Sequence, residues 1–217
     1  MLYLAMAICL ALLVLVMAPS STRRERERAE RHQLIIDAAR DLAETEGWDA
    51  VTTRRLAGIV EYSQPVLYSH FDGKDAIVRA VAVQGFADLA GSMRHIHLKH
   101  ADSATAEGTK ARRQALRAAC LAYLDFAVTR PAVYQAMFVM PTGVKFASEQ
   151  TPPELRAAFD EFAAVLPPSS PHRELTAEVI WSSLHGLATL AATGRIPPEG
   201  QEQRVDVLLS GITAADA

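Results

Sequence analysis

The 217-residue sequence has few aromatic residues, two cysteines and little net charge. Aromatic residues make up 6% of the chain and hydrophobic residues 50%, with alanine and leucine frequent. This composition favours helices that pack through small side chains. No segment combines sustained strand alternation with glycine-rich turns. We therefore expect an all-α fold.

Several kinds of chemistry are missing as well. The cysteines, Cys9 and Cys120, form no metal-binding or redox spacing, so a reducing compartment is the simplest interpretation. A net charge of −3 excludes a basic field over the whole protein, so any affinity for nucleic acid must come from a local patch. We find no Ser-His-Asp spacing, glycine-rich phosphate loop or paired carboxylates. We therefore expect neither an enzyme nor a cofactor.

The first 18 residues, MLYLAMAICLALLVLVMA, carry no charge and approach the minimum length of a membrane-spanning helix. A signal peptide is disfavoured because its basic start is missing. A membrane anchor would leave Arg23 and the following arginines on the cytoplasmic side. We favour a third interpretation, in which translation starts at Met17. The expected location is cytoplasmic, with a membrane-anchored form as the alternative.

Residues 52–74 predict two short helices joined by a tight turn. Thr53 is expected to cap the first helix, and Ser63 the second. Pro65 suits the first turn of the second helix, where its missing N–H costs little. The residues expected to point inward are Leu56, Ile59, Val60, Leu67 and Phe71. The residues then expected to face outward are Gln64, Pro65, Val66, Tyr68 and Ser69, and such a helix fits the DNA major groove.

The run LAGIVEYSQPVLYSHFDGKDAIVRAV resembles the helix-turn-helix of the TetR family of bacterial repressors. The match is strongest over residues 67–71 and at Lys74-Asp75, and the resemblance covers roughly residues 26–80. Glu61 stands where the family usually has glycine in the turn. A side chain there is strained if φ is positive, and a carboxylate repels phosphates. We therefore expect either a differently built turn or weaker DNA binding.

The resemblance implies a homodimeric repressor on a palindromic operator in double-stranded DNA, released by a small molecule; the mainly apolar candidate pocket residues favour a hydrophobic effector. It places bases or thymine methyls against Gln64, Pro65, Val66 and Tyr68. It places phosphates at Thr53, Arg54, Ser63, Tyr68, His70 and Lys74. The implied domains are a three-helix DNA-binding domain over residues 23–75 and a larger helical domain for ligand binding and dimerisation over residues 76–217.

The C-terminal part predicts helices over residues 74–99, 110–129, 132–138, 154–166, 174–193 and 203–212. Trp181, His185 and Gly186 form a W-x3-H-G pattern that resembles a C-terminal subgroup of TetR-like regulators named for these residues. The candidate ligand-binding residues are Phe126, Tyr134, Met137, Phe138, Trp181 and His185, although ordinary core packing is the alternative for them. The last two helices are expected to form the dimer as a four-helix bundle.

Other features have two interpretations. The alternating arginines and glutamates of residues 23–31 are either a phosphate-contacting arm or a solvated helix start. Trp48 is expected to cover the small N-terminal core rather than stack on a base. His95, His97 and His100 are interpreted as surface histidines, with a metal site as the less favoured alternative. Two variants of the function stay open: a membrane-tethered regulator, and a ligand-binding dimer in which Glu61 has abolished DNA binding.

Overall fold

The computed structural model describes residues 2–100, 106–146, 148–167 and 172–215, with side chains for residues 22–99, 110–146, 148–167 and 172–212. The described residues form helices and no strands, which confirms the all-α expectation. The elements are α1 (Leu2–Glu46), η1 (Trp48–Ala50), α2 (Thr53–Ile59), α3 (Gln64–Tyr68), α4 (Lys74–His100), α5 (Ala106–Thr129), α6 (Pro131–Phe138), α7 (Pro153–Ala164), α8 (Arg173–Ala192) and α9 (Gln201–Ala215).

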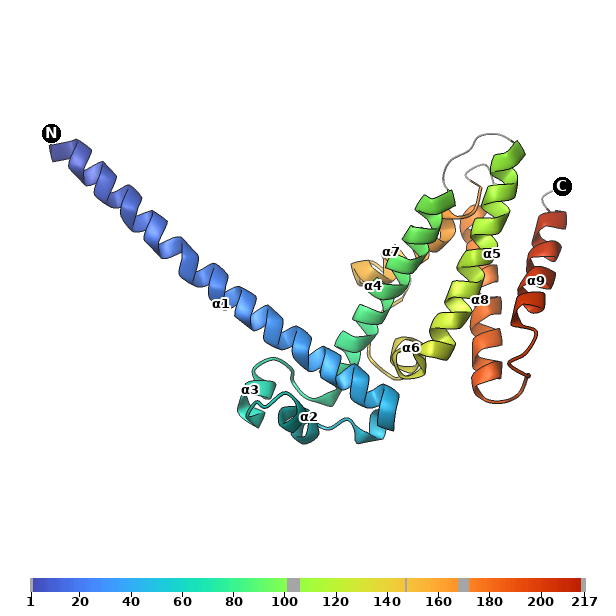
Figure 1. Cartoon of the computed structure of the whole chain (residues 1–217), viewed down its shortest axis with the longest axis horizontal. Helices are drawn as coiled ribbons and strands as arrows, with labels where there is room; N and C mark the ends of the chain where they lie inside the picture. The colour runs from blue at the N-terminus through green and yellow to red at the C-terminus, as the bar shows by residue number, and fades with distance from the viewer. Residues whose placement is uncertain (1, 101–105, 147, 168–171, 216–217) are drawn as a thin grey trace.

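The long helix α1 begins within the apolar N-terminal segment and projects away from the other helices (Figure 1). Among the helices of the described part of the chain, none is both long enough and apolar enough to cross a membrane. The side chains of residues 1–18 lie outside the described residues. The anchor, the signal peptide and the start at Met17 therefore stay predictions.

The C-terminal half of α1 packs with α2, α3 and the start of α4 around a small core. Ile35, Leu56, Leu67 and Ile77 are completely buried there. One predicted core position is wrong: Ile59 is 50% exposed, because the buried face of this segment is centred on Leu56, Ala57 and Val60 and Ile59 lies beyond its edge. The predicted cap is also wrong by one residue. Thr52 caps α2 by accepting a hydrogen bond from the Arg55 N–H at 3.2 Å.

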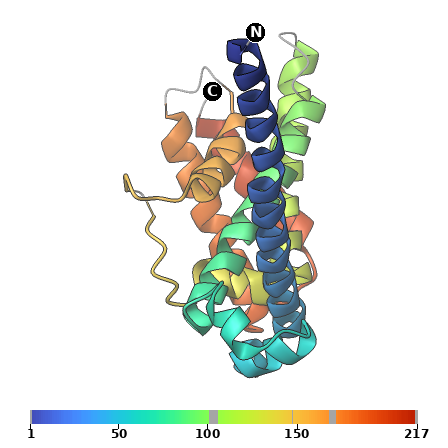
Figure 2. The same cartoon turned by 90° about the vertical axis from the view of Figure 1, so that its left-hand side faces the viewer.

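The remaining helices form a bundle in which α5, α8 and α9 lie side by side (Figure 1). In Figure 2, which is viewed from the side to which α1 projects, α1 lies in front of this bundle. Arg117 of α5 holds α9 through Asp206 at 2.6 Å and Glu202 at 2.9 Å. Helix α4 runs from the N-terminal core into this bundle, and α7 packs along it. The predicted helix positions agree with those observed to within a few residues, although α5 begins at Ala106.

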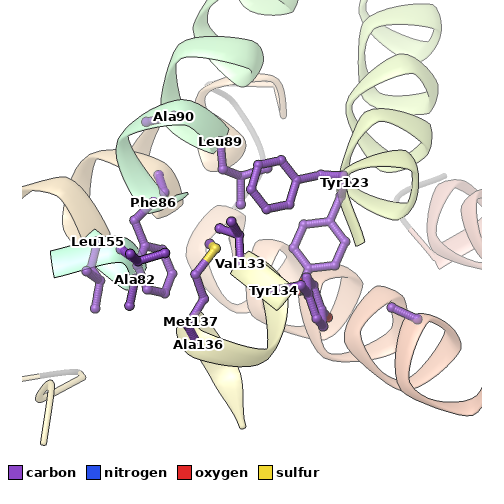
Figure 3. Close-up of a cluster of buried hydrophobic side chains, with 14 of the residues drawn as sticks. Ala82, Phe86, Leu89, Ala90, Tyr123, Val133, Tyr134, Ala136, Met137 and Leu155 are labelled. Atoms are coloured by element: carbon purple, nitrogen blue, oxygen red, sulfur yellow. The ribbon is translucent and has the colours of Figure 1, made fainter. Parts of the chain in front are cut away.

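Helix α6 crosses α4 at a close approach that only glycine permits. A Cβ added to Gly85 would lie 2.5 Å from Val133 Cγ1 and 2.7 Å from Met137 Sδ. Figure 3 shows Val133 and Met137 on the side of α6 that faces α4, while Tyr134 lies toward Tyr123 of α5. Helix α6 therefore packs between α4 and α5.

Candidate functional site

Helix α3 presents a polar face to solvent because its apolar residues are buried beneath it. Leu67 is 0% exposed and Phe71 5% exposed, as predicted. Ser63 is the N-cap and Pro65 lies in the first turn. Gln64, Pro65, Tyr68 and Ser69 are exposed, and Val66 is half-buried. The exposed surface thus offers an amide, hydroxyls and a proline ring at one helix end.

Contacts from neighbouring helices fix the orientation of α3. The hydroxyls of Thr53 and Tyr68 lie 3.3 Å apart, which joins α2 to α3. Arg55 holds α2 to the end of α1 through two bonds to the Glu46 carboxylate, at 2.7 and 2.9 Å. Arg54 is exposed and free to reach outward. Lys74, half-buried at the start of α4, donates from its ammonium to the Trp48 carbonyl.

The turn between α2 and α3 has the geometry of a glycine turn although Glu61 occupies it. Glu61 has a φ of 57°, and among the residues that the structure describes it is the one non-glycine residue with positive φ. The Tyr62 N–H bonds the Ala57 carbonyl at 2.9 Å, the six-to-one bond of a Schellman helix ending. The turn is therefore not built differently, and the exposed Glu61 takes a conformation that a Cβ disfavours.

Beside α3 lies a small hollow of about 330 Å³ lined by the α1 residues Arg24, Glu27, Arg28 and Arg31 and by Ser69 and His70. Glu27 pairs with Arg31 at 3.6 Å and with Arg23 at 2.8 Å. His32 stacks on Phe71 with ring centroids 4.3 Å apart. Burial, helped by nearby positive charge, lowers the pKa of both His32 and His70. The hollow is a local positive patch adjoining the polar face of α3.

A second, larger cavity of about 870 Å³ lies in the C-terminal bundle. Its wall is mostly apolar and comes from α4, α5, α6, α7, α8 and the segment before α7, with Phe86, Leu89, Met93, Phe138, Phe159 and Trp181 among the lining residues. Three charged residues also line it, Glu149, Arg156 and Glu178, and all three are exposed. The buried Ser148 hydroxyl borders the cavity and has no hydrogen-bond partner among the described residues. Such a cavity suits a drug-sized apolar molecule.

The candidate ligand-binding residues fall into three groups according to where they lie relative to the cavity. Phe138 and Trp181 line the cavity. Tyr134 and His185 lie behind its wall, joined by a 2.7 Å hydrogen bond between the Tyr134 hydroxyl and His185 Nδ1. Phe126 lies under the Arg130 guanidinium at 5.4 Å, and Met137 packs against α4 at Gly85. The role of all six in ligand binding stays a prediction.

Tyr123, which was not among the predicted ligand-binding residues, also lines the cavity. Its hydroxyl accepts the Trp181 indole N–H at 3.2 Å and lies 3.0 Å from the Tyr134 hydroxyl. Burial raises the pKa of Tyr123 to about 12 and also raises that of Tyr134, while it lowers the pKa of His185. The available signal was that tyrosine on an apolar helix face needs a hydrogen-bond partner when it is buried.

The start of α6 is clamped to the N-terminal core. The Glu44 carboxylate of α1 accepts the Ala132 and Val133 N–H groups, both at 3.0 Å. The Trp48 indole N–H donates to the Ala132 carbonyl at 2.8 Å. Trp48 is 5% exposed, so its predicted structural role is confirmed. Because α6 also carries Phe138, one short helix joins the cavity wall to the core beneath α3.

The histidines of α4 form no metal site in the described part of the chain. His97 lies 3.5 Å from Glu161 of α7, and Arg94 lies 3.8 Å from the same carboxylate. No group of three potential metal ligands occurs among the residues whose placement is described. The His100 side chain lies outside them.

The outer face of α8 carries large apolar side chains that nothing in the described chain covers. Leu175, Val179 and Leu190 are 58%, 57% and 40% exposed. Gly186 shares their face, and a Cβ there would meet nothing within 4 Å. On the adjacent α9, Val207 is 72% exposed. Another helix could approach this surface closely.

Comparisons with known proteins agree on the family. Residues 35–81 match the model "Bacterial regulatory proteins, tetR family", and residues 116–212 match "Tetracyclin repressor-like, C-terminal domain". The HTH-type transcriptional regulator YobS of Bacillus subtilis is 33% identical over 104 residues, which are 48% of this chain and 49% of YobS. The matched part thus spans about half the length of that relative.

Solved structures share the fold. A protein from Rhodococcus sp. RHA1 has a TM-score of 0.64 at 21% identity, covering 83% of this chain and 94% of that one. A TetR variant from Acinetobacter baumannii in complex with minocycline has a TM-score of 0.56 at 18% identity, covering 84% and 96%. The resemblance to the W-x3-H-G subgroup stays a prediction.

Proposed function

Because the chain belongs to the TetR family of bacterial regulatory proteins, we propose that it is a homodimeric transcriptional repressor released from its operator by a small apolar ligand. The observation that carries the proposal is the exposed polar face of α3 above buried Leu67 and Phe71. This face adjoins the positive patch formed by the α1 arginines, while a separate apolar cavity lies in the C-terminal bundle. The repressor would work in the cytoplasm, where the chromosome is.

On DNA, α3 would lie in the major groove. Gln64 can make two hydrogen bonds to adenine, and Pro65 and Val66 suit thymine methyls. Arg54, the hydroxyls of Thr53, Ser63 and Tyr68, His70 and Lys74 would bind phosphates, as would the arginines of α1. Phosphate contacts supply position and affinity, and base contacts supply sequence preference. A dimer would place two α3 helices in successive grooves.

The dimer would form through the outer faces of α8 and α9, where Gly186 permits close approach. Val179→Asp places a charge on that surface and should give a monomer in light scattering after gel filtration. Val128→Asp is the matched control, because Val128 is 63% exposed and belongs to α5 rather than to α8 or α9. A dimeric Val179→Asp variant would contradict this interface.

Ligand release would act through α6. A molecule in the cavity touches Phe138, and movement of α6 must be transmitted through Glu44 and Trp48 to the core that supports α3. The minocycline complex of the Acinetobacter protein supports a multi-ring ligand for this fold. Tight binding alone changes nothing: the ligand must prefer the conformation that does not fit DNA.

The DNA-binding half is tested by fluorescence anisotropy with a labelled mixed-sequence duplex at 50 and 200 mM salt. Arg54→Ala should weaken binding and lower the slope of log K against log salt by about one for each phosphate that the variant no longer neutralises. Arg156→Ala removes the same charge at the cavity and should leave the slope unchanged. Equal effects of the two variants would reject the proposed role of Arg54 in phosphate binding.

A further inference from the structure

A chain of four polar groups runs from the cavity wall into the bundle. It comprises the Trp181 indole, the Tyr123 and Tyr134 hydroxyls and His185 Nδ1, joined at 3.2, 3.0 and 2.7 Å. Tyr123 and Trp181 line the cavity, and neither Tyr134 nor His185 does. The chain therefore links the cavity to α6 and α8. We call it the hydroxyl relay.

The protons of the relay have two consistent arrangements. The indole N–H can only donate, so Tyr123 accepts from Trp181 in both. In the first, Tyr123 donates to Tyr134, Tyr134 donates to His185 Nδ1, and His185 carries its proton on Nε2. In the second, His185 Nδ1–H donates to Tyr134 and Tyr134 donates to Tyr123. The Tyr123 proton is then left without a partner in the relay.

The two arrangements present different groups to a ligand. In the first arrangement Tyr123 accepts from Trp181 and donates to Tyr134, so its proton is used inside the relay and only its second lone pair remains for a ligand. In the second arrangement the Tyr123 oxygen accepts from both Trp181 and Tyr134, and its proton is the group that it can still offer the cavity. Without a ligand, the first arrangement satisfies every proton between Trp181 and His185, so it should predominate. A ligand with an acceptor at Tyr123 stabilises the second.

The charges lining the cavity narrow the ligand class further. Glu149 and Glu178 repel a carboxylate, and Arg156 already donates to the Ser148 carbonyl at 3.3 Å. The remaining wall is mostly apolar. An uncharged ligand with a carbonyl oxygen fits these surroundings better than an acid.

Building on the proposed effector cavity, we propose that the effector is an uncharged, largely apolar molecule that places a hydrogen-bond-acceptor oxygen on Tyr123. Its binding reverses the hydroxyl relay and moves the His185 proton from Nε2 to Nδ1. The proton count is unchanged, since one nitrogen loses a proton to water while the other gains one. Half-buried His185 reaches solvent for this exchange.

Fluorene and 9-fluorenone test the proposal because they share a three-ring shape and differ by one carbonyl oxygen. Isothermal titration calorimetry of the full chain should show fluorenone binding about fivefold to tenfold more tightly, the value of roughly one hydrogen bond. Tyr123→Phe should remove this preference while retaining fluorene binding. Tyr62→Phe, a tyrosine change in the N-terminal core, is the matched control and should keep the preference.

Nitrogen-15 NMR of histidine-labelled protein reads the His185 tautomer directly. The proton should lie on Nε2 in the free protein and with fluorene, and on Nδ1 with fluorenone. Tyr134→Phe keeps the Tyr123–Trp181 pair and cuts the link to His185. This variant should keep the fluorenone preference but lose the tautomer change, and it provides the test if Tyr123→Phe does not fold.

The outcomes separate the two proposals. Equal affinity for fluorene and fluorenone, or an unchanged His185 tautomer with fluorenone bound, overturns the relay and leaves the effector cavity standing. If neither compound binds up to its solubility limit, the effector cavity is rejected, and the relay inference falls with it.

Discussion

Replacing Glu61 tests the cost of a side chain in the turn between α2 and α3. Glu61 has φ of 57°, and the Tyr62–Ala57 bond closes a helix ending that glycine normally makes. A left-handed residue with a Cβ costs about 1–2 kcal/mol. Glycine also gives the unfolded chain more conformational freedom than glutamate does, and this lowers the stability of the folded protein by about 0.4–1 kcal/mol. Glu61→Gly should therefore stabilise the protein by about 0.5–1 kcal/mol.

Urea unfolding at fixed protein concentration measures this gain, and the melting temperature should rise by about 1–4 °C for a chain of this size. Glu61→Gln is the matched control: it removes the charge, keeps the strain and should leave stability nearly unchanged. Both variants should bind DNA about two- to fivefold more tightly at low salt, because each removes a carboxylate near phosphates. The strain argument is refuted if Glu61→Gly is no more stable than Glu61→Gln.

Three further predictions concern the approach of α6 to α4, the cap of α6 and the half-buried histidines. Gly85→Ala should destabilise the protein by about 1–3 kcal/mol in urea unfolding, since its Cβ overlaps two side chains of α6. Gly91→Ala on the same helix meets open space and should instead be neutral or stabilising; equal effects would contradict the close approach. Glu44→Ala should lower the free energy of unfolding by about 1–2 kcal/mol, because it removes the cap of α6. If the DNA affinity of this variant still responds to cavity ligands as in the wild type, the contact between Glu44 and α6 does not transmit the effect of the ligand. Stability should fall as pH drops below 6.5, because the histidines with lowered pKa values bind protons first in the unfolded chain. The urea midpoint should be lower at pH 5.5 than at pH 7.5, and less so in His70→Gln; an unchanged midpoint would refute the burial argument.

Local signals in the sequence predicted the helices and the orientation of α3. The spacing of Leu67 and Phe71 placed them inward, and Pro131 and Pro153 each fall at the first residue of a helix. The predicted N-cap of α2 was wrong by one residue, Thr53 instead of Thr52, because either of two adjacent threonines can cap a helix.

Contacts between distant residues could not be predicted in this way. Glu44 caps α6 across 88 residues, and Tyr123 meets Trp181 across 58. Both depend on how the helices pack, and a glutamate inside a helix looks like any solvated residue until its partner is placed. Tyr123 likewise has the spacing of an ordinary core residue. The cavity belongs to this second class, because six segments contribute its wall.

The central claim is that this chain reads a DNA sequence as a dimer. Selection of bound duplexes from a random pool by the full chain, at two salt concentrations, tests it most directly. The account predicts an enriched palindrome whose half-sites lie about one helical turn apart, with affinity that falls steeply as salt rises. It also predicts that Gln64→Ala relaxes the selected sequence, whereas Lys74→Ala weakens binding to all sequences alike. Failure to enrich any sequence, with weak binding even at low salt, would contradict the claim and leave the ligand cavity as the functional part of the molecule.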